Sequence, residues 1–296
     1  MQYIIKKYDN QEKEQLNQLL HLCFEDEYLL NIVGSSNLKF AYSAFCENKL
    51  VGFIIAWTSS FHPYCTYFRI LSNPLYSKLK IEEKLLSTLE KLEEINFPIQ
   101  TSIWETSVNL KRVYENNGFK EIRRTYMPKL TVSDIKEELP DCSNEYRIIT
   151  LAEVLSNRKL MDRLTHVVKD NYEKTHIVNP VASVGVKKWR ELIVSDDIIA
   201  NGSFIYVDKN ENNIIAYSFL HESDKKNSFE LGWCGVSNNQ KKNLVPQLIF
   251  QQIKYCIKKD VKFIIGEFDT TDQYALEVLQ SFPFAPCPTW ITYQKM

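Results

Sequence analysis

The sequence predicts an α/β protein built from two copies of one unit in tandem. The chain has 296 residues, which fits two domains of roughly 150 residues, each long enough to bury a core of its own. Residues about 163 to 165 positions apart also carry the same kinds of element in the same order through most of each half. An internal duplication accounts for both observations.

The strands that open each half support the duplication. Alternating apolar and polar residues predict a first strand at 3–8 (YIIKKY) and its counterpart at 146–151 (YRIITL). A hairpin strand is expected at 49–57 (KLVGFIIAW) and again at 213–221 (NIIAYSFLH), each after a turn signal. The two halves therefore begin alike.

The later elements also correspond. The strands expected at 67–71 and 229–236 both end at a Ser-Asn dipeptide, and an amphipathic helix follows each of them. Each half then continues with a further strand, a short helix and an aromatic terminus. The final strands are expected at 126–130 and 291–295.

A polar segment sets the expected boundary between the halves. Residues 131–145 are rich in charged residues and poor in apolar ones, so we expect a linker there. The expected domains are therefore 1–130 and 146–296. The second half also carries an additional stretch, 160–199, which predicts two helices on either side of Pro180. This stretch either forms one wall of a binding cleft or packs against the sheet.

Charge and cysteine content disfavour several classes of protein. Lysine and arginine (36) nearly balance aspartate and glutamate (37), so counting gives no basic face for nucleic acid or an anionic membrane. Seven cysteines form an odd set without a CxxC pair, which argues against a disulfide framework or a zinc site. No signal peptide or run of ~20 apolar residues is present. We expect a soluble, cytoplasmic, metal-free protein.

The order strand, helices, hairpin, strand, loop, helix, strand, helix, strand occurs twice and resembles the GCN5-related N-acetyltransferase (GNAT) superfamily. The resemblance implies two GNAT-like domains, each with a mixed, mostly antiparallel central sheet flanked by helices. It also implies acetyl-CoA as cosubstrate. Backbone N–H groups of the loop after the fourth strand, and the helix N-terminus behind that loop, would hold its pyrophosphate.

That loop is altered in the first half. Residues 73–76 (NPLY) resemble the family's lead-in, but residues 77–82 contain no glycine. Glu82 and Glu83 fall near the N-terminus of the following helix, where a carboxylate would repel a phosphate. The resemblance therefore implies a degenerate cofactor loop in this half.

The second half keeps more of the loop. Residues 240–245 (QKKNLV) retain the leading Gln and place Asn243 at the glycine position. Because Asn adopts a left-handed backbone more readily than most residues, we expect that conformation at Asn243. The alternative is a solvated charged turn that enters a helix. The expected cofactor-binding residues are Val236, Gln240, Lys241, Lys242, Asn243, Leu244 and Val245.

The resemblance also implies two catalytic residues. Tyr114 matches the family tyrosine that protonates the departing CoA thiolate, whereas Leu279 stands at that position in the second half. Glu230 matches a place where the family often carries a base that acts through water. A solvated carboxylate at a strand end is the alternative. Gly232 and Gly235 in the same strand suggest a bulge or the close approach of a ligand to the backbone.

The expected function is acyl transfer from acetyl-CoA to the amine of a small-molecule or peptide acceptor, at one site in the second half. Two alternatives remain open. A non-catalytic acyl-CoA-binding or regulatory protein is favoured by the altered loops and the missing tyrosine. A tandem aminoacyl transferase that builds cell-wall peptides would need a basic surface facing tRNA, which the near-neutral charge disfavours.

Overall fold

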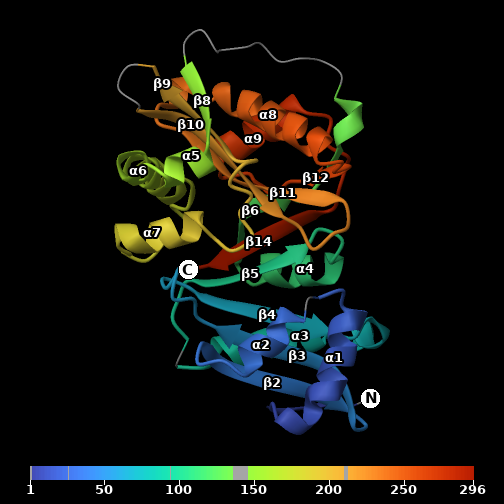
Figure 1. Ribbon diagram of the computed structural model, residues 1–296. Helices are drawn as coiled ribbons and strands as arrows, with labels where there is room; N and C mark the ends of the chain where they lie inside the picture. The colour runs from blue at the N-terminus through green and yellow to red at the C-terminus, as the bar shows by residue number, and fades with distance from the viewer. Residues whose placement is uncertain (1, 26, 94, 136–145, 210–212) are drawn as a thin grey trace. The chain divides into compact units, whose positions relative to one another are not determined.

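The computed structural model describes residues 2–25, 27–93, 95–135, 146–209 and 213–296. The chain divides into two compact units. Unit 1 comprises Met1–Ile122, Val178–Ala182 and Ile291–Met296, and unit 2 comprises Arg123–Ile177 and Ser183–Trp290. Each unit is a mixed sheet with helices on both faces, the fold class predicted from the sequence (Figure 1). Most of the expected linker, residues 136–145, lies outside the described residues.

The sheet of unit 1 has the strand order β1-β2-β3-β4-β5-β14-β6, and its last two strands, β14 and β6, include residues of both units. The strands are β1 (Ile4–Lys7), β2 (Leu38–Cys46), β3 (Lys49–Trp57), β4 (Thr66–Ser72), β5 (Ile99–Trp104), β14 (Thr289–Lys295) and β6 (Lys120–Tyr126). Helices α1 (Lys13–Leu22) and α2 (Tyr28–Val33) pack on one face, and α3 (Ile81–Glu90) and α4 (Val108–Asn116) on the other.

Unit 2 has the strand order β7-β12-β11-β10-β9-β8. Its strands are β7 (Lys129–Thr131), β12 (Phe263–Ile265), β11 (Ser228–Val236), β10 (Ile214–Glu222), β9 (Phe204–Asp208) and β8 (Tyr146–Thr150), while β13 (Phe268–Asp269) pairs with the end of β6. Its helices are α5 (Leu151–Leu155), α6 (Arg158–Thr175), α7 (Val186–Ile193), α8 (Leu244–Lys258) and α9 (Gln273–Ser281).

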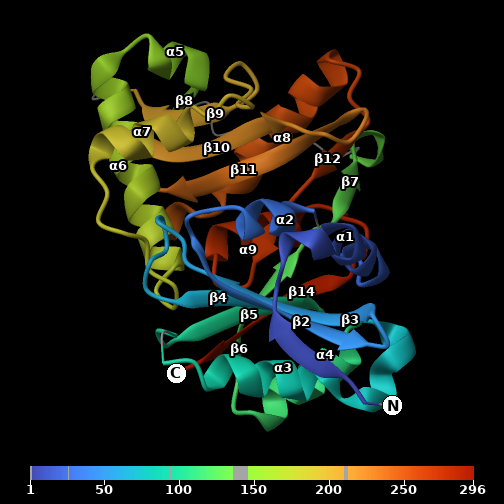
Figure 2. The same cartoon turned by 90° about the horizontal axis from the view of Figure 1, so that it is seen from below.

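The additional stretch of the second half does form two helices, α6 and α7, which lie with α5 on one face of the unit 2 sheet (Figure 2). Helices α8 and α9 cover the opposite face. Strand alternation separates the two cores. Tyr206 of β9 joins the core beneath α8, whereas its neighbours Ile205 and Val207 join the core beneath α6. None of the described helices is long and apolar enough to span a membrane.

The terminal strands lie in sheets other than those expected. The sequence placed 126–130 at the end of the first half and 291–295 at the end of the second. Strand β14 instead lies between β5 and β6 in the first sheet, and β7 lies beside β12 in the second. An alternating pattern marks a strand and its buried face but does not identify the neighbouring strand, which explains the difference.

Candidate functional site

In unit 2 the parallel strands β11 and β12 pair and then separate. The paired positions are Ser228↔Phe263, Phe229↔Ile264 and Glu230↔Ile265. Beyond them β12 ends, whereas β11 continues to Val236. The N–H of Ser237 donates to the carbonyl of Ile215, just beyond β11 on the β10 side (2.9 Å). Because backbone groups alternate along a strand, those of Cys234 and Val236 face the open edge.

The same strand carries a bulge just before the open edge. The flanking pairs are Ser218↔Cys234 and Leu220↔Leu231. Between them one residue of β10 faces two of β11, Gly232 and Trp233. A Cβ atom at Gly232 would lie 2.4 Å from Nε2 of His221, so any side chain here would displace the His221 ring. The bulge predicted from the glycines is confirmed.

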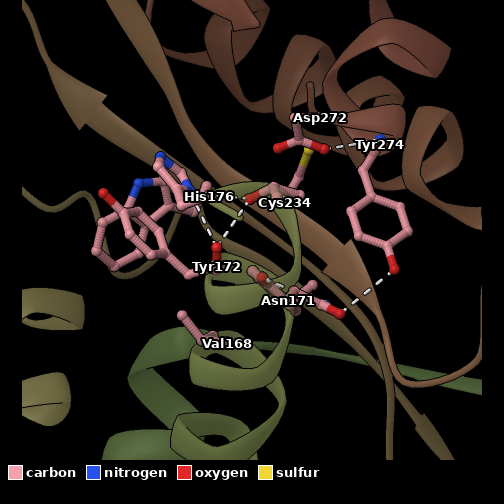
Figure 3. Close-up of a pocket in the computed structure, with 10 residues that line it drawn as sticks. Val168, Asn171, Tyr172, His176, Cys234, Asp272 and Tyr274 are labelled. Carbon is pink, nitrogen blue, oxygen red and sulfur yellow. Dashed lines mark hydrogen bonds between the residues drawn. The ribbon is translucent and has the colours of Figure 1, made fainter. Parts of the chain in front are cut away.

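A pocket lies at this open edge. Its empty space amounts to about 290 Å³ when the open solvent at its mouth is counted, and its lining comes from α6, β10, the end of β11 and the first turn of α9. Figure 3 shows side chains from these elements converging on it. All of the lining residues belong to unit 2.

One side of the pocket is aromatic. The rings of Tyr172 and His176, one helical turn apart on α6, stack with centroids 3.8 Å apart and an angle of 7° between their planes. The ring of Trp233, from the bulge, lies 5.0 Å from Tyr172, and the buried Trp189 of α7 lies 5.3 Å from it. We call Tyr172, His176 and Trp233 the aromatic wall. Trp189 holds it from behind.

A hydrogen-bonded amide forms the inner end of the pocket. Nδ2 of the buried Asn171 donates to the open-edge carbonyl of Val236 (3.0 Å). The hydroxyl of Tyr274 approaches Oδ1 of Asn171 (3.3 Å) and Oδ1 of Asn239 (2.5 Å). Asn171 therefore connects α6, β11 and α9.

Among the described residues that line the pocket, Asp272 is the only carboxylate. Its Oδ1 caps α9 by accepting the N–H groups of Tyr274 (2.8 Å) and Ala275 (3.2 Å). Burial raises the pKa of this carboxyl, the two backbone bonds oppose the rise, and Asp269 adds to it. Figure 3 places the sulfur of Cys234 beside the carboxylate. Burial and Asp272 raise the pKa of that thiol well above its usual value, so Cys234 is a protonated thiol rather than a nucleophile.

Three carboxylates lie near the aromatic wall, since Asp269 and Glu267 act on Tyr172, and Glu230 acts on Glu267. We call Glu230, Glu267 and Asp269 the acidic rim. Although Glu267 is exposed on one side, desolvation and Asp269 raise the pKa of its carboxyl, Arg123 opposes the rise, and Glu230 adds to it. Nη1 of Arg123 lies 3.1 Å from Oδ2 of Asp269. Across the described residues, no cluster of His, Cys, Asp and Glu suits a metal ion.

The side chains of the predicted cofactor loop have protein partners of their own. Nζ of Lys241 donates to the Tyr146 hydroxyl (2.7 Å) and lies 4.8 Å from the centre of its ring. Nζ of Lys242 lies 2.8 Å from the carboxylate of Glu277. Val236 and the loop residues Leu244 and Val245 are buried in the core, so those three could meet a ligand with backbone atoms alone. The side chain of Gln240 lies outside the described residues.

The expected left-handed backbone at Asn243 is wrong. Its φ of -63° and ψ of -9° are right-handed, because the loop closes as a tight turn that runs directly into α8. The N–H of Lys242 donates to the carbonyl of Asn239 (3.3 Å), and that of Val245 to the carbonyl of Lys242 (3.1 Å). What the loop offers a phosphate is the positive end of a 15-residue helix.

The two predicted catalytic residues lie in different units. Glu230 is the last residue of β11 that pairs with β12, and its Oε1 accepts a bond from the Ser223 hydroxyl (2.7 Å). Tyr114 belongs to unit 1, where it is fully buried against Phe68 and Phe119. Burial raises the pKa of this phenol above its usual value, an effect that Arg69 partly offsets.

Unit 1 has the corresponding pair of strands without the bulge. Strands β4 and β5 pair at Thr66↔Ile99 and Tyr67↔Gln100 and then part. The register of β3 with β4 is continuous from Gly52↔Ser72 to Trp57↔Tyr67. Strand β4 is therefore regular where it separates from β5, whereas β11 carries a bulge where it separates from β12.

Polar side chains of unit 1 occupy its own open edge. The Cys23 thiol donates to the carbonyl of Ser72 (3.3 Å), and the Ser72 hydroxyl donates to the buried Glu82 in the first turn of α3 (2.5 Å). Nε of Arg69, also on β4, lies 3.4 Å from the carboxylate of Glu25, and both side chains are buried. Glu82 thus places a carboxylate of the protein itself in the first turn of α3.

Comparison with known proteins gives a likeness of fold. No described protein family matches the sequence, and no curated protein does. Among solved structures, a GCN5-related N-acetyltransferase from Sphaerobacter thermophilus aligns with a TM-score of 0.67 and 11% identity, over 99% of this chain and 95% of that one. A tandem GNAT protein from the clavulanic acid biosynthesis pathway aligns with a TM-score of 0.63 and 11% identity, over 99% and 98%.

A glucosamine N-acetyltransferase region of a fungal multi-domain β-N-acetylglucosaminidase also aligns, with a TM-score of 0.68 and 12% identity, over 99% of this chain and 38% of that one. The alignments span both units rather than one of them. The chain therefore has the tandem GNAT fold, as the sequence resemblance implied.

Proposed function

We propose that this protein is an acyl-CoA-dependent N-acyltransferase that moves an acetyl group from acetyl-CoA to an amine, with its site in unit 2. The observation that carries the proposal is the bulged, separated pair β11 and β12 with a pocket at the open edge. Exposed backbone groups at such an edge can pair with the amides of a pantetheine arm and with a thioester carbonyl.

The donor end of the site combines an edge and a helix terminus. The N–H groups of Cys234 and Val236 face the open edge, where they can stabilise the oxyanion that forms when the thioester carbonyl is attacked. The N-terminus of α8, beginning at Leu244, supports the diphosphate through its positive end. Lys242 adds charge there.

The reaction needs two proton movements and no covalent intermediate. An ammonium acceptor loses one proton to become a nucleophile, and its nitrogen loses a second as the C–N bond forms and the C–S bond breaks. One proton goes to the leaving thiolate and one to solvent, so the products are the amide, free CoA thiol and a proton. Glu230 remains our proposed base. Tyr274, a buried phenol on α9 five positions before Leu279, is the proposed proton donor.

Unit 1 is proposed as a structural partner. Its corresponding open-edge carbonyl, that of Ser72, accepts a bond from Cys23, the same strand carries the buried pair of Arg69 and Glu25, and Glu82 lies in the first turn of α3. A carboxylate there repels a phosphate. We therefore expect one acetyl-CoA per chain.

Calorimetry with acetyl-CoA tests the proposal, together with release of free thiol across a panel of amines. The sharpest variant pair is Lys242→Glu, at the start of α8, against Lys258→Glu, at the end of the same helix. We expect the first to weaken acetyl-CoA binding at least tenfold and the second to change it less than twofold. No binding by the parent protein, two equal sites, or equal effects of the two variants would overturn the proposal.

A second candidate function has its own observation in favour. The Asn171 side chain already donates a hydrogen bond to the Val236 carbonyl, which a ligand amide would otherwise use. The second half also has Leu279 where the resemblance implies a tyrosine. Both suit a protein that binds an acyl-CoA without turning it over. Acetyl-CoA binding with no thiol release above the uncatalysed rate, across all amines tested, would favour this regulatory reading.

A further inference from the structure

Among the described residues, the lining of the pocket in unit 2 contains a carboxylate but no lysine or arginine. Those residues supply aromatic rings, an amide, a thiol, a hydroxyl and an aliphatic side chain, and the carboxylate is that of Asp272. A ligand that carries a carboxylate or a phosphate into this pocket would meet the carboxylate of Asp272 and no lysine or arginine of the described lining, whereas a cation would meet an opposite charge.

The carboxylate of Asp272 has capacity left for a ligand. Among the described residues, both of its hydrogen bonds end on Oδ1, and they come from the backbone of α9. An ionised carboxylate accepts about four hydrogen bonds over its two oxygens. Oδ2 can therefore accept from an ammonium group while Oδ1 keeps the helix cap.

A second observation, independent of Asp272, points to the same charge. The acidic rim places Glu230, Glu267 and Asp269 close enough to influence one another, with Arg123 as the opposing charge in the same group. Tyr172 of the aromatic wall feels Arg123 first, and then Asp269 and Glu267 with the opposite sign. Three carboxylates and one guanidinium give this group a net negative charge, which attracts cations.

The aromatic wall specifies the body of the ligand. The ring centres of Tyr172 and Trp233 lie 5.0 Å apart, with an angle of 60° between the ring planes, and both rings pack against the buried Trp189. The ring of His176 is stacked on that of Tyr172. Fixed rings favour flat or apolar groups, which gain contact area without ordering the protein further. An ammonium beside such rings gains an additional cation–π attraction.

We propose that the acceptor is a small primary amine with a flat, apolar body and no carboxylate next to the amine, bound with its ammonium at Asp272 and its body on the aromatic wall. This inference rests on the proposed function, since it names the acceptor of that site. It separates aryl-substituted alkylamines from amino acids, amino-sugar phosphates and the amino termini of acidic peptides.

Calorimetry without any acyl donor tests this inference separately from catalysis. The probes are 2-phenylethylamine, phenylalanine, which adds a carboxylate to the same body, 2-phenylethanol, which lacks the charge, and n-butylamine, which lacks the ring. We expect 2-phenylethylamine to bind at least tenfold more tightly than each of the other three. In the presence of acetyl-CoA, the same order should hold for kcat/KM.

Asp272→Asn is the decisive variant, because Asn caps a helix about as well as Asp and removes only the charge. This substitution should lower the affinity for 2-phenylethylamine at least tenfold, while the acetyl-CoA affinity and the melting temperature stay close to those of the parent protein. Asp170→Asn, on the exposed side of α6, is the matched control and should change nothing. Trp233→Leu should remove the preference for 2-phenylethylamine over n-butylamine.

The outcomes separate the two proposals. If acetyl-CoA binds and is turned over but phenylalanine or n-butylamine is preferred, the acceptor inference is wrong and the proposed function stands. If 2-phenylethylamine binds in the predicted manner and acetyl-CoA does not, the function is wrong and the cation pocket stands. Unchanged amine affinity in Asp272→Asn would refute the assignment of Asp272.

Discussion

Gly235 offers a test of the pocket that needs no ligand. A Cβ atom at this position would lie 2.4 Å from Nδ2 of Asn171 and 3.0 Å from the hydroxyl of Tyr217. Both neighbours are buried, so the Asn171 side chain would have to leave its place. Gly235→Ala therefore acts by removing Asn171 from its hydrogen-bond partners, although it deletes no polar group itself.

The size of the effect follows from the bonds that Asn171 makes. Displacement breaks its bond to the Val236 carbonyl and its bond with Tyr274. Each bond contributes about 1 kcal/mol, and a buried group left without a partner costs about 1–3 kcal/mol. We expect Gly235→Ala to lower the free energy of unfolding by about 3–5 kcal/mol. In a unit of this size that is a fall in melting temperature of about 6–20 °C.

The assay is thermal unfolding combined with amide hydrogen exchange of peptides from β11, which reports on unit 2 separately from unit 1. Gly185→Ala is the matched control, since a Cβ there meets nothing within 4 Å and a change at this helix cap should cost less than about 1 kcal/mol. In an Asn171→Ala background the clash with Nδ2 is gone, so the second substitution should cost far less than it does alone. Equal losses in both backgrounds would refute the geometry assigned to Asn171.

Three further predictions concern residues singled out from the sequence. Tyr114→Phe should leave turnover within about twofold, because the phenol is enclosed in the core of unit 1; a fall of about 10² or more, as for loss of an acid, would return Tyr114 to the mechanism. Asn243→Val should change acetyl-CoA affinity less than about threefold, since its backbone is right-handed and open to ordinary residues; calorimetry decides this. Glu230→Gln should lower kcat by about 10² with acetyl-CoA affinity little changed, and an unaltered kcat and pH profile would exclude Glu230 as the base.

The fold could be predicted because its signals are local. Alternation in 49–57 marks β3, which spans those residues, and the additional stretch of the second half divides into α6 and α7 as its apolar spacing and Pro180 indicate. The positions of β14 and β7 in the two sheets could not be predicted. Strand neighbours depend on long-range packing that no local pattern records.

The pocket was harder to predict because its parts come from distant segments. Asn171, Trp233 and Asp272 lie on different elements, and each has an ordinary local role as a helix residue, a strand aromatic or a helix cap. One signal was available in the sequence. Tyr172 and His176 are four positions apart, the spacing at which two side chains meet on one face of a helix. The helix expected from the sequence ends at Tyr172, however, and the structure extends it to Thr175. The partners of Lys241 and Lys242, by contrast, follow only from tertiary structure.

In each unit a side chain donates a hydrogen bond to the backbone carbonyl at the equivalent place on the open edge. The N–H of Asn73 bonds to the Val51 carbonyl as that of Ser237 bonds to the Ile215 carbonyl, both at 2.9 Å, so Ser72 corresponds to Val236. The Ser72 carbonyl accepts a bond from Cys23, and the Val236 carbonyl accepts one from Asn171. Both donors lie in the segment that precedes the sheet hairpin of their unit.

Capping alone therefore does not distinguish the units. A ligand amide that replaces Asn171 at Val236 exchanges one neutral hydrogen bond for another, at a net cost of about 1 kcal/mol or less. In unit 1 the strand that carries Ser72 also carries the buried pair of Arg69 and Glu25. A ligand that separated this pair would leave an unpaired buried charge, which costs about 3–5 kcal/mol and weakens binding by two to three orders of magnitude or more at ~1.4 kcal/mol per tenfold. The duplicated halves thus differ in the groups beside the equivalent strand end: unit 2 offers a neutral amide that can be exchanged, whereas unit 1 has a buried ion pair that is costly to disturb.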